Sequence, residues 1–240
     1  MNRFAVFFLV SLFYNTVNAQ HTATHANMLW FNYNNTVFIN DKWSIASDAQ
    51  LRTRDWTGRW SQFALRTGVA YKINKKFTAT AGFAWFGNVR YFNGKPIVPN
   101  EWRPWQEVAY QLKGKKINFT QRLRTEQRFQ QQVVNEKKTQ DYQERFRLRY
   151  RFEFGFPVNK EKITASIGNE VMVNPGHISD SVFFDQNRSF FFMNFKLTPA
   201  TIFQFQFIKL FQWQAANRIL DDQNVFRFSI HQQFHLRKKK

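Results

Sequence analysis

The sequence predicts an all-β fold, a transmembrane antiparallel up-and-down β-barrel of about 10–12 strands with a polar, arginine-rich lumen. The first observation is segment 142–154, YQERFRLRYRFEF, where apolar residues alternate with arginines. Successive side chains of a strand point to opposite faces, so this segment has one apolar and one charged face. The second observation is that this alternation recurs along the chain. The third is that 30 Phe coexist with a mean hydropathy of -0.53, and that no apolar run beyond the N-terminus approaches the ~20 residues of a spanning helix.

The charge balance has two explanations. Lys+Arg is 35 and Asp+Glu is 16, which gives a formal net charge of +19 and suggests nucleic acid as a partner. The basic residues alternate with aromatic ones, however, and a soluble protein would have to cover that aromatic face. A soluble basic β-protein that binds nucleic acid is therefore the least favoured class, and we expect no nucleic-acid partner. The chain has no Cys, which excludes disulfides, zinc–thiolate sites and a cysteine nucleophile.

The N-terminus has the features of a secretory signal. Arg3 supplies a positive charge, residues 4–14 form a short apolar core, and residues 17–19 end in the small-residue pattern that precedes cleavage. We therefore expect a signal peptide over 1–19, cleaved after Ala19, and the outer membrane of a Gram-negative bacterium as the location. The expected organisation continues with a short polar leader over 20–27, the barrel over 28–236 and a basic tail over 237–240.

Eleven segments show the period of a strand: residues 28–39, 43–54, 60–73, 77–91, 101–113, 117–129, 142–154, 162–174, 186–198, 201–213 and 223–236. Their predicted outward faces carry, in chain order, Leu29, Phe31, Tyr33 and Val37; Trp43, Ile45, Ala49 and Leu51; Phe63, Leu65, Val69, Tyr71 and Ile73; Phe83 and Trp85; Val108, Tyr110 and Leu112; Ile117, Phe119, Leu123 and Phe129; Phe146, Leu148, Tyr150, Phe152 and Phe154; Ile163, Ile167, Val171 and Val173; Phe191, Met193, Phe195 and Leu197; Phe203, Phe205, Phe207 and Phe211; and Phe226, Phe228, Ile230 and Phe234. Bacterial single-chain barrels have even strand numbers, so we expect that either the first segment is not a full wall strand or a twelfth is unrecognised.

Short and long connections alternate between these segments. The predicted tight turns are residues 40–42, 74–76, 113–116, 157–161 and 198–200, and the predicted long links are 55–59, 92–100, 130–141, 175–185 and 214–222. Periplasmic turns and outer loops of membrane barrels differ in this way. Aromatic residues near segment ends are candidates for interfacial girdles: Trp30, Trp43, Trp60, Tyr91, Trp102 and Trp213.

The strongest chemical feature is a ladder of charges on the predicted inward faces: Arg52, Arg54, Arg66, Arg103, Glu107, Arg122, Arg124, Glu126, Arg128, Arg145, Arg147, Arg149, Arg151, Glu153 and Glu170. Antiparallel pairing would set arginines of 117–129 beside those of 142–154, so counter-charges are required. One interpretation is a salt-bridge network that fills a narrow barrel. The other is an anion-attracting pore or pocket.

Catalytic signals are weak, and we identify no catalytic residue, metal site or cofactor. An outer-membrane enzyme of the barrel phospholipase type would need Ser and His on the outer wall. Ser229 and His231 lie two residues apart, but both point inward in the predicted register. A possible site at the rim of the barrel consists of Asp185, Gln186, Asn187 and Arg188, for which anchoring a loop is the simpler role.

Several strings resemble a family of uncharacterised outer-membrane barrels, domain of unknown function 2490: the segment 43–54, EWRPWQE at 101–107, RLRTEQRF at 122–129, 145–151, NEV at 169–171 and FDQNR at 184–188. The resemblance spans essentially the whole mature chain and implies an outer-membrane barrel without an assigned activity. Outer-membrane lipid, the barrel-assembly machinery and small anions are the expected partners, and a monomer is favoured. Such barrels commonly end on an aromatic residue, whereas here Phe234 and Leu236 precede the basic tail.

Overall fold

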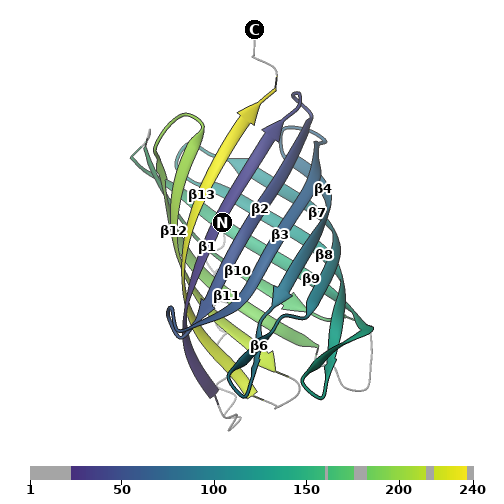
Figure 1. Cartoon of the computed structure of the whole chain (residues 1–240). Coiled ribbons are helices and arrows are strands. Elements are labelled where there is room, and N and C mark those ends of the chain that lie inside the picture. The colour runs from purple at the N-terminus through teal and green to yellow at the C-terminus, as the bar shows by residue number, and fades with distance from the viewer. Residues whose placement is uncertain (1–22, 160–161, 176–182, 215–218, 237–240) are drawn as a thin grey trace, which may run out of the picture.

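In a computed structural model the chain forms one closed β-barrel, described for residues 23–159, 162–175, 183–214 and 219–236 (Figure 1). The expected signal peptide, the cleavage site and the basic tail lie outside the described residues. The strands are β1 (Ala23–Phe38), β2 (Trp43–Arg54), β3 (Arg59–Lys72), β4 (Phe77–Asn88), β5 (Arg90–Phe92), β6 (Lys95–Ile97), β7 (Asn100–Lys113), β8 (Asn118–Val134), β9 (Lys137–Asn159), β10 (Ile163–Val173), β11 (Phe184–Lys196), β12 (Thr201–Gln214) and β13 (Ile219–His235). The all-β barrel prediction is confirmed.

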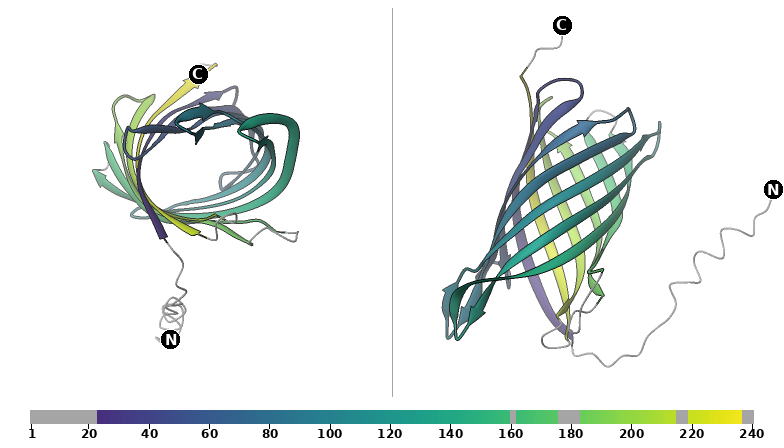
Figure 2. Two further views of the ribbon diagram at one scale, coloured as in Figure 1. Left: turned by 60° about the horizontal axis from the view of Figure 1, so that its bottom comes forward. Right: turned by 90° about the vertical axis from the view of Figure 1, so that its right-hand side faces the viewer.

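The wall has an odd number of strands in the described part of the chain, eleven, in the order β1-β13-β12-β11-β10-β9-β8-β7-β4-β3-β2. Each expected segment supplies one wall strand, so the expectation of an even number is wrong. An up-and-down chain with an odd number of strands has its first and last strands running the same way. The barrel therefore closes on a parallel pair, β1 with β13, whereas its other neighbours pair antiparallel. We call the β1–β13 contact the seam; Figure 2 shows the closed ring.

The two ends of the barrel differ, as the connections predict. The strand ends that border the predicted tight turns lie at one end, together with the end of β13, and those that border the predicted longer links lie at the other, together with the start of β1 (Figure 1). We call these the turn end and the loop end. The predicted long link over 130–141 is wrong, because β8 and β9 continue to a two-residue turn at Asn135 and Glu136, both with positive φ. A polar sequence does not by itself end the backbone hydrogen bonding between two strands of a hairpin. The 92–100 link likewise contains part of a small hairpin, β5–β6.

The outer surface of the wall is apolar, in the predicted register. Leu65, Val69, Val108 and Ile167 are about half exposed there, at 56%, 47%, 47% and 53%. Aromatic residues pair across neighbouring strands near the turn end, including Trp43 with Tyr71, Phe77 with Tyr110 and Phe119 with Phe154, with ring centroids 4.6, 5.0 and 4.8 Å apart. Such pairs form the girdle that borders the apolar band of a membrane barrel.

One predicted girdle residue is on the other side of the wall. Trp30 is only 2% exposed and faces the lumen, where it belongs to an apolar cluster with Met28, Phe190 and Leu210, among others. The outer face also carries one polar group near the loop end. Lys209 Nζ lies 2.5 Å from Asp222 Oδ1, and His25 Nδ1 lies 3.1 Å from Asp222 Oδ2. No helix in the described ranges is long and apolar enough to span a bilayer.

Glycines in the wall make room for aromatic side chains inside the barrel. Gly68 is paired with Gly82, which is paired in turn with Trp105. A Cβ added at Gly82 would lie 2.5 Å from the Trp105 ring and would also contact the Thr67 carbonyl oxygen, and one at Gly68 would lie 2.8 Å from the same ring. Trp105 therefore rests directly on the backbone of the wall.

We expect Gly82→Ala to destabilise the barrel by about 1–3 kcal/mol, because the added methyl group overpacks both the backbone and the indole ring. Urea titration of the refolded barrel measures the change. Gly155→Ala is the matched control, because its added Cβ would approach side-chain atoms and no backbone atom within 4 Å: the Ser166 hydroxyl oxygen at 3.2 Å and Asn118 Cβ at 3.7 Å. Equal losses of stability in the two variants would contradict this account of Gly82.

Candidate functional site

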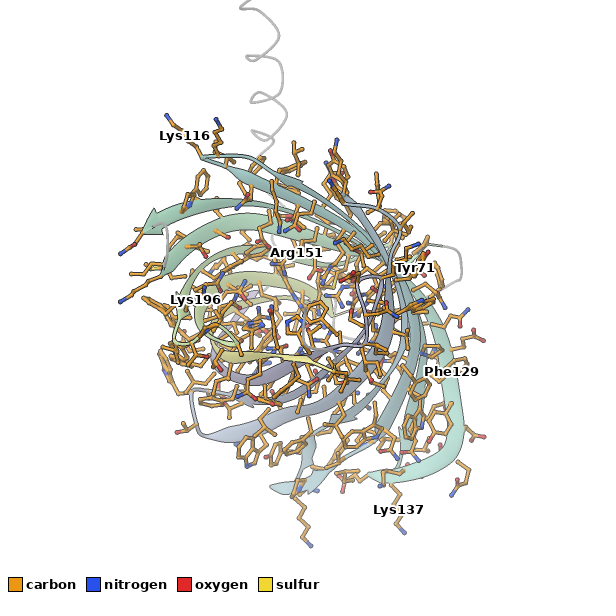
Figure 3. The ribbon with its side chains drawn as sticks, turned by 90° about the horizontal axis from the view of Figure 1, so that it is seen from above. Tyr71, Lys116, Phe129, Lys137, Arg151 and Lys196 are labelled. Atoms are coloured by element: carbon orange, nitrogen blue, oxygen red, sulfur yellow. The ribbon has the colours of Figure 1, made fainter. Side chains whose placement is uncertain are left out.

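The interior of the barrel holds the charge ladder. Alternation in each strand turns all of its predicted members toward the lumen, and side chains fill the ring of strands, with Arg151 among them (Figure 3). Glu107 and Glu126 also face inward, on β7 and β8, and Glu153 and Glu170 on β9 and β10. The structure therefore gathers the arginines of the predicted ladder inside the barrel.

The pairing of β8 with β9 sets like charges side by side. Arg122 is opposite Arg151, Arg124 is opposite Arg149, and Arg128 is opposite Arg145. Like charges directly across an antiparallel pair destabilise it. The wall formed by β7 to β10 is thus stable only because carboxylates from the same strands reach between these guanidinium groups.

Two carboxylates, those of Glu126 and Glu170, bridge most of the arginines of this wall. Glu126, which is 3% exposed, lies 2.6 Å from Arg149 and 3.5 Å from Arg103. Glu170 lies 2.9 Å from the same Arg149 and 2.5 Å from Arg122. Arg149 therefore joins the two carboxylates. A buried charge is tolerated when it is both paired and hydrogen-bonded, and each of these groups satisfies that requirement.

A third carboxylate, Glu101, was not among the predicted ladder residues. Its oxygens accept hydrogen bonds from Arg103 at 2.7 Å and Arg128 at 2.6 Å, and from Asn88 and Gln130. Glu107 pairs with Arg124 at 2.6 Å. The signal for Glu101 was present, since it shares the alternation of Arg103 and Glu107.

The four predicted rim residues do not form one group. The pairing of β10 with β11 shifts between Met172 and Val173, which makes Asp185 the extra residue of a bulge. Both Asp185 and Gln186 are therefore buried, and Asp185 lies 2.7 Å from Arg147. Arg188 also faces the lumen, whereas Asn187 faces outward and exchanges hydrogen bonds with Asn169.

The remaining ladder residues have separate partners near the edges of the network. Arg54 pairs with Asp221 at 3.1 Å, Arg66 with Asp48 at 2.9 Å and Arg151 with Glu153 at 2.6 Å. Arg145 donates a hydrogen bond to the Gln143 side chain at 3.0 Å. All residues of the predicted ladder thus face the lumen. Their ion pairs, however, divide them into a central network and several isolated pairs.

Aromatic rings hold several guanidinium groups in place. Arg103 lies over Phe86, Arg124 over Trp105 and Arg151 over Phe190, at 3.7, 4.2 and 4.2 Å from the ring centroids. Stacking of this kind favours the cation and restricts its orientation. The inward aromatic residues were not predicted, although Trp105 and Phe190 share the alternation of the charged residues on their strands, and Phe86 shares that of Thr80 and Gly82 on β4, which has no charged residue.

A cavity of about 430 Å³ lies within the lumen. Among the described residues, eleven arginines line it, and the carboxylates that line it are two, Glu101 and Glu170. Both of these glutamates are already engaged by arginines. Five further carboxylates of the described residues pair with lining arginines: Asp48, Glu107, Glu126, Glu153 and Asp185. The eleven arginines still outnumber these seven carboxylates, so the cavity is positive and its chemistry suits an anion.

Other chemistries receive little support from the described residues. Ser229 and His231 both face the lumen, where Ser229 is 1% exposed, so this pair does not present a nucleophile to lipid outside the wall. No three His, Asp or Glu side chains in the described ranges are placed to hold a metal ion.

Comparison with known proteins places the chain in an uncharacterised group. A family model described as "Protein of unknown function (DUF2490)" matches residues 27–221. No curated protein matches the chain. A solved structure described as the NanC porin in a rhombohedral crystal form is similar, with a TM-score of 0.47 and 12% identity over 77% of this chain and 84% of that one.

Proposed function

The chain belongs to the DUF2490 family, whose function is unknown, and we propose that it forms an anion-preferring passage in the outer membrane of a Gram-negative bacterium. The apolar outer face supports the membrane location, because lipid would cover side chains such as Leu65 and Val108 that water would otherwise contact. Outer-membrane lipid and, during assembly, the barrel-assembly machinery are then its partners.

The single observation that carries the preference for anions is the composition of the cavity lining. Eleven arginines and two glutamates line the described cavity, and both glutamates are already paired. An entering anion meets an excess of positive charge in a confined volume where screening is weaker than in bulk water. A cation meets the opposite field. The preference follows from the sum of fixed charges and does not depend on one residue.

Single-channel recording tests the proposal. The refolded mature chain is inserted into a planar bilayer with a KCl gradient, and heat-modifiable gel mobility verifies that the barrel has folded. We expect discrete conductance steps whose reversal potential lies toward that of chloride. A reversal potential toward that of potassium would refute the preference for anions. Folded protein without any conductance would refute the passage and leave the arginines as a structural salt-bridge core.

A further inference from the structure

The seam carries a row of lumen-facing residues that are paired with one another across five neighbouring strands. Trp30 on β1 is paired with Arg52 on β2 and with Arg227 on β13. The row continues from Arg227 to Gln206 on β12 and from Arg52 to Gln62 on β3. We call these five residues the seam row. Strand pairing alone brings them together, because they lie far apart in the sequence.

Glutamine oxygens, which carry no formal charge, orient the two arginines of the seam row. Arg52 donates a hydrogen bond to Gln50 Oε1 at 2.7 Å, and Arg227 donates one to Gln204 Oε1 at 3.2 Å. Neither forms an ion pair with a carboxylate of the described residues. This is the reverse of the β7–β10 wall, where glutamates neutralise the arginines that they orient. Each glutamine amide holds a guanidinium group in place by a hydrogen bond but does not neutralise its positive charge.

The seam row also contains buried donors that lack a partner. Within the described residues, Trp30 Nε1, Arg52 Nε and Arg227 Nε are buried and make no hydrogen bond, and the row also holds two buried acceptors without a partner, Gln62 Oε1 and Gln206 Oε1. The Nε atoms of Arg122, Arg147, Arg149 and Arg188 are unpartnered as well, but these four arginines form ion pairs with carboxylates, whereas Arg52 and Arg227 form none in the described ranges. The side chain of Trp30 is 2% exposed, and all three residues line the cavity. Arg52 additionally lies over the Trp30 ring, 3.9 Å from its centroid, and Arg188 lies 5.4 Å from it. Unpaired buried donors destabilise a protein unless a ligand or water completes them.

We propose that the seam row is a fixed site for one oxyanion, a phosphate or a carboxylate group. The three donors come from residues paired directly across adjacent strands, and two of them belong to cations that have no carboxylate partner in the part of the chain that the structure describes. An oxyanion offers several acceptor oxygens and a negative charge to complete them, whereas chloride offers no such array. This inference rests on the proposed function, because it identifies the class of anion and where in the lumen it stops.

Titration calorimetry of the refolded full chain in a phospholipid-free nonionic detergent tests the site. Inorganic phosphate, acetate and glycerol phosphate are the probes. We expect saturable binding of one phosphate per chain. Arg52→Gln and Arg227→Gln should each weaken it by about 10-fold to 100-fold, since each removes a charge-assisted hydrogen bond. Trp30→Phe keeps a ring but removes the donor, and should weaken binding by about 2-fold to 10-fold.

Arg145→Gln is the matched control. Arg145 faces the lumen and is held by a glutamine, as Arg52 is, but it does not line the cavity. The control loses the same charge and should bind phosphate within about twofold of wild type. An equal loss in the control, or chloride competing as well as acetate, would refute a fixed site.

The two proposals fail in different ways. Anion-selective conductance without saturable binding of either phosphate or acetate would refute the seam site and leave the anion preference standing. Saturable binding without conductance would refute the passage and leave the site. Among the probes, binding of glycerol phosphate as tight as that of free phosphate supports a phosphate ester as the natural ligand, and binding of acetate alone supports a carboxylate.

Discussion

Glu126→Gln lowers the free energy of unfolding of the barrel by about 3–5 kcal/mol, the range expected when one partner of a buried ion pair is removed. Glutamine keeps the shape of the side chain but loses its charge. Arg149 and Arg103, at 2.6 and 3.5 Å from the carboxylate, would then lie beside a neutral group, with Arg124 and Arg147 each 3.9 Å away. The like charges paired across β8 and β9 would repel without compensation.

Urea titration of the barrel refolded in lipid vesicles measures this loss, with tryptophan fluorescence as the signal. Glu153→Gln is the control, because Arg151 is the one ion-pair partner of Glu153 among the described residues and both side chains are 20% exposed. We expect the control to lose about 1 kcal/mol or less, in the range of solvated ion pairs. If both variants unfold at the same urea concentration, the network around Glu126 does not stabilise the barrel.

Thr36→Pro prevents closure of the barrel. Thr36 lies within β1, where it is paired with Gln233 on β13 and with Ala46 on β2. Proline has no N–H to donate and does not fit a strand that has a neighbour on both sides. An unsatisfied backbone group in the lipid region costs several kcal/mol, on the order of the whole stability of a small domain.

Gel mobility with and without heating gives the fraction of refolded protein for this variant. We expect little or no folded form for Thr36→Pro. Thr36→Val, which is nearly the same shape and keeps the backbone N–H, should refold as wild type does. A normal yield for the proline variant would show that β1 is not part of the wall, and the odd strand number would then be wrong.

Alternation was enough to predict the wall and most of its charges. In residues 146–154 every second residue is apolar, so a single assignment of faces predicts that the arginines of this stretch face the lumen, as they do in the structure. The same rule would have placed Trp30 and Glu101 inside, because each shares the alternation of lumen residues on its strand. The prediction that Trp30 belongs to the outer girdle is wrong, because a position near a segment end does not determine which face of the strand a side chain is on.

Other features depend on contacts between distant strands, which one sequence does not reveal. The bulge that buries both Asp185 and Gln186 follows from the register between β10 and β11. The parallel seam follows from counting every strand correctly, and the rule of even numbers argued against that count. The seam row requires the registers of β1 with β2 and of β1 with β13 together, and neither is encoded locally.

The parallel seam also determines which ends of the chain can be reached from each side of the membrane. β1 begins at the loop end and β13 finishes at the turn end, whereas an even number of strands would bring both to the same side (Figure 1). An epitope placed just before Ala23 and one placed just after His235 would therefore meet antibodies on opposite faces of the membrane. The first wall strand to be synthesised, β1, also cannot complete its backbone hydrogen bonds until the last strand, β13, is available to pair with it.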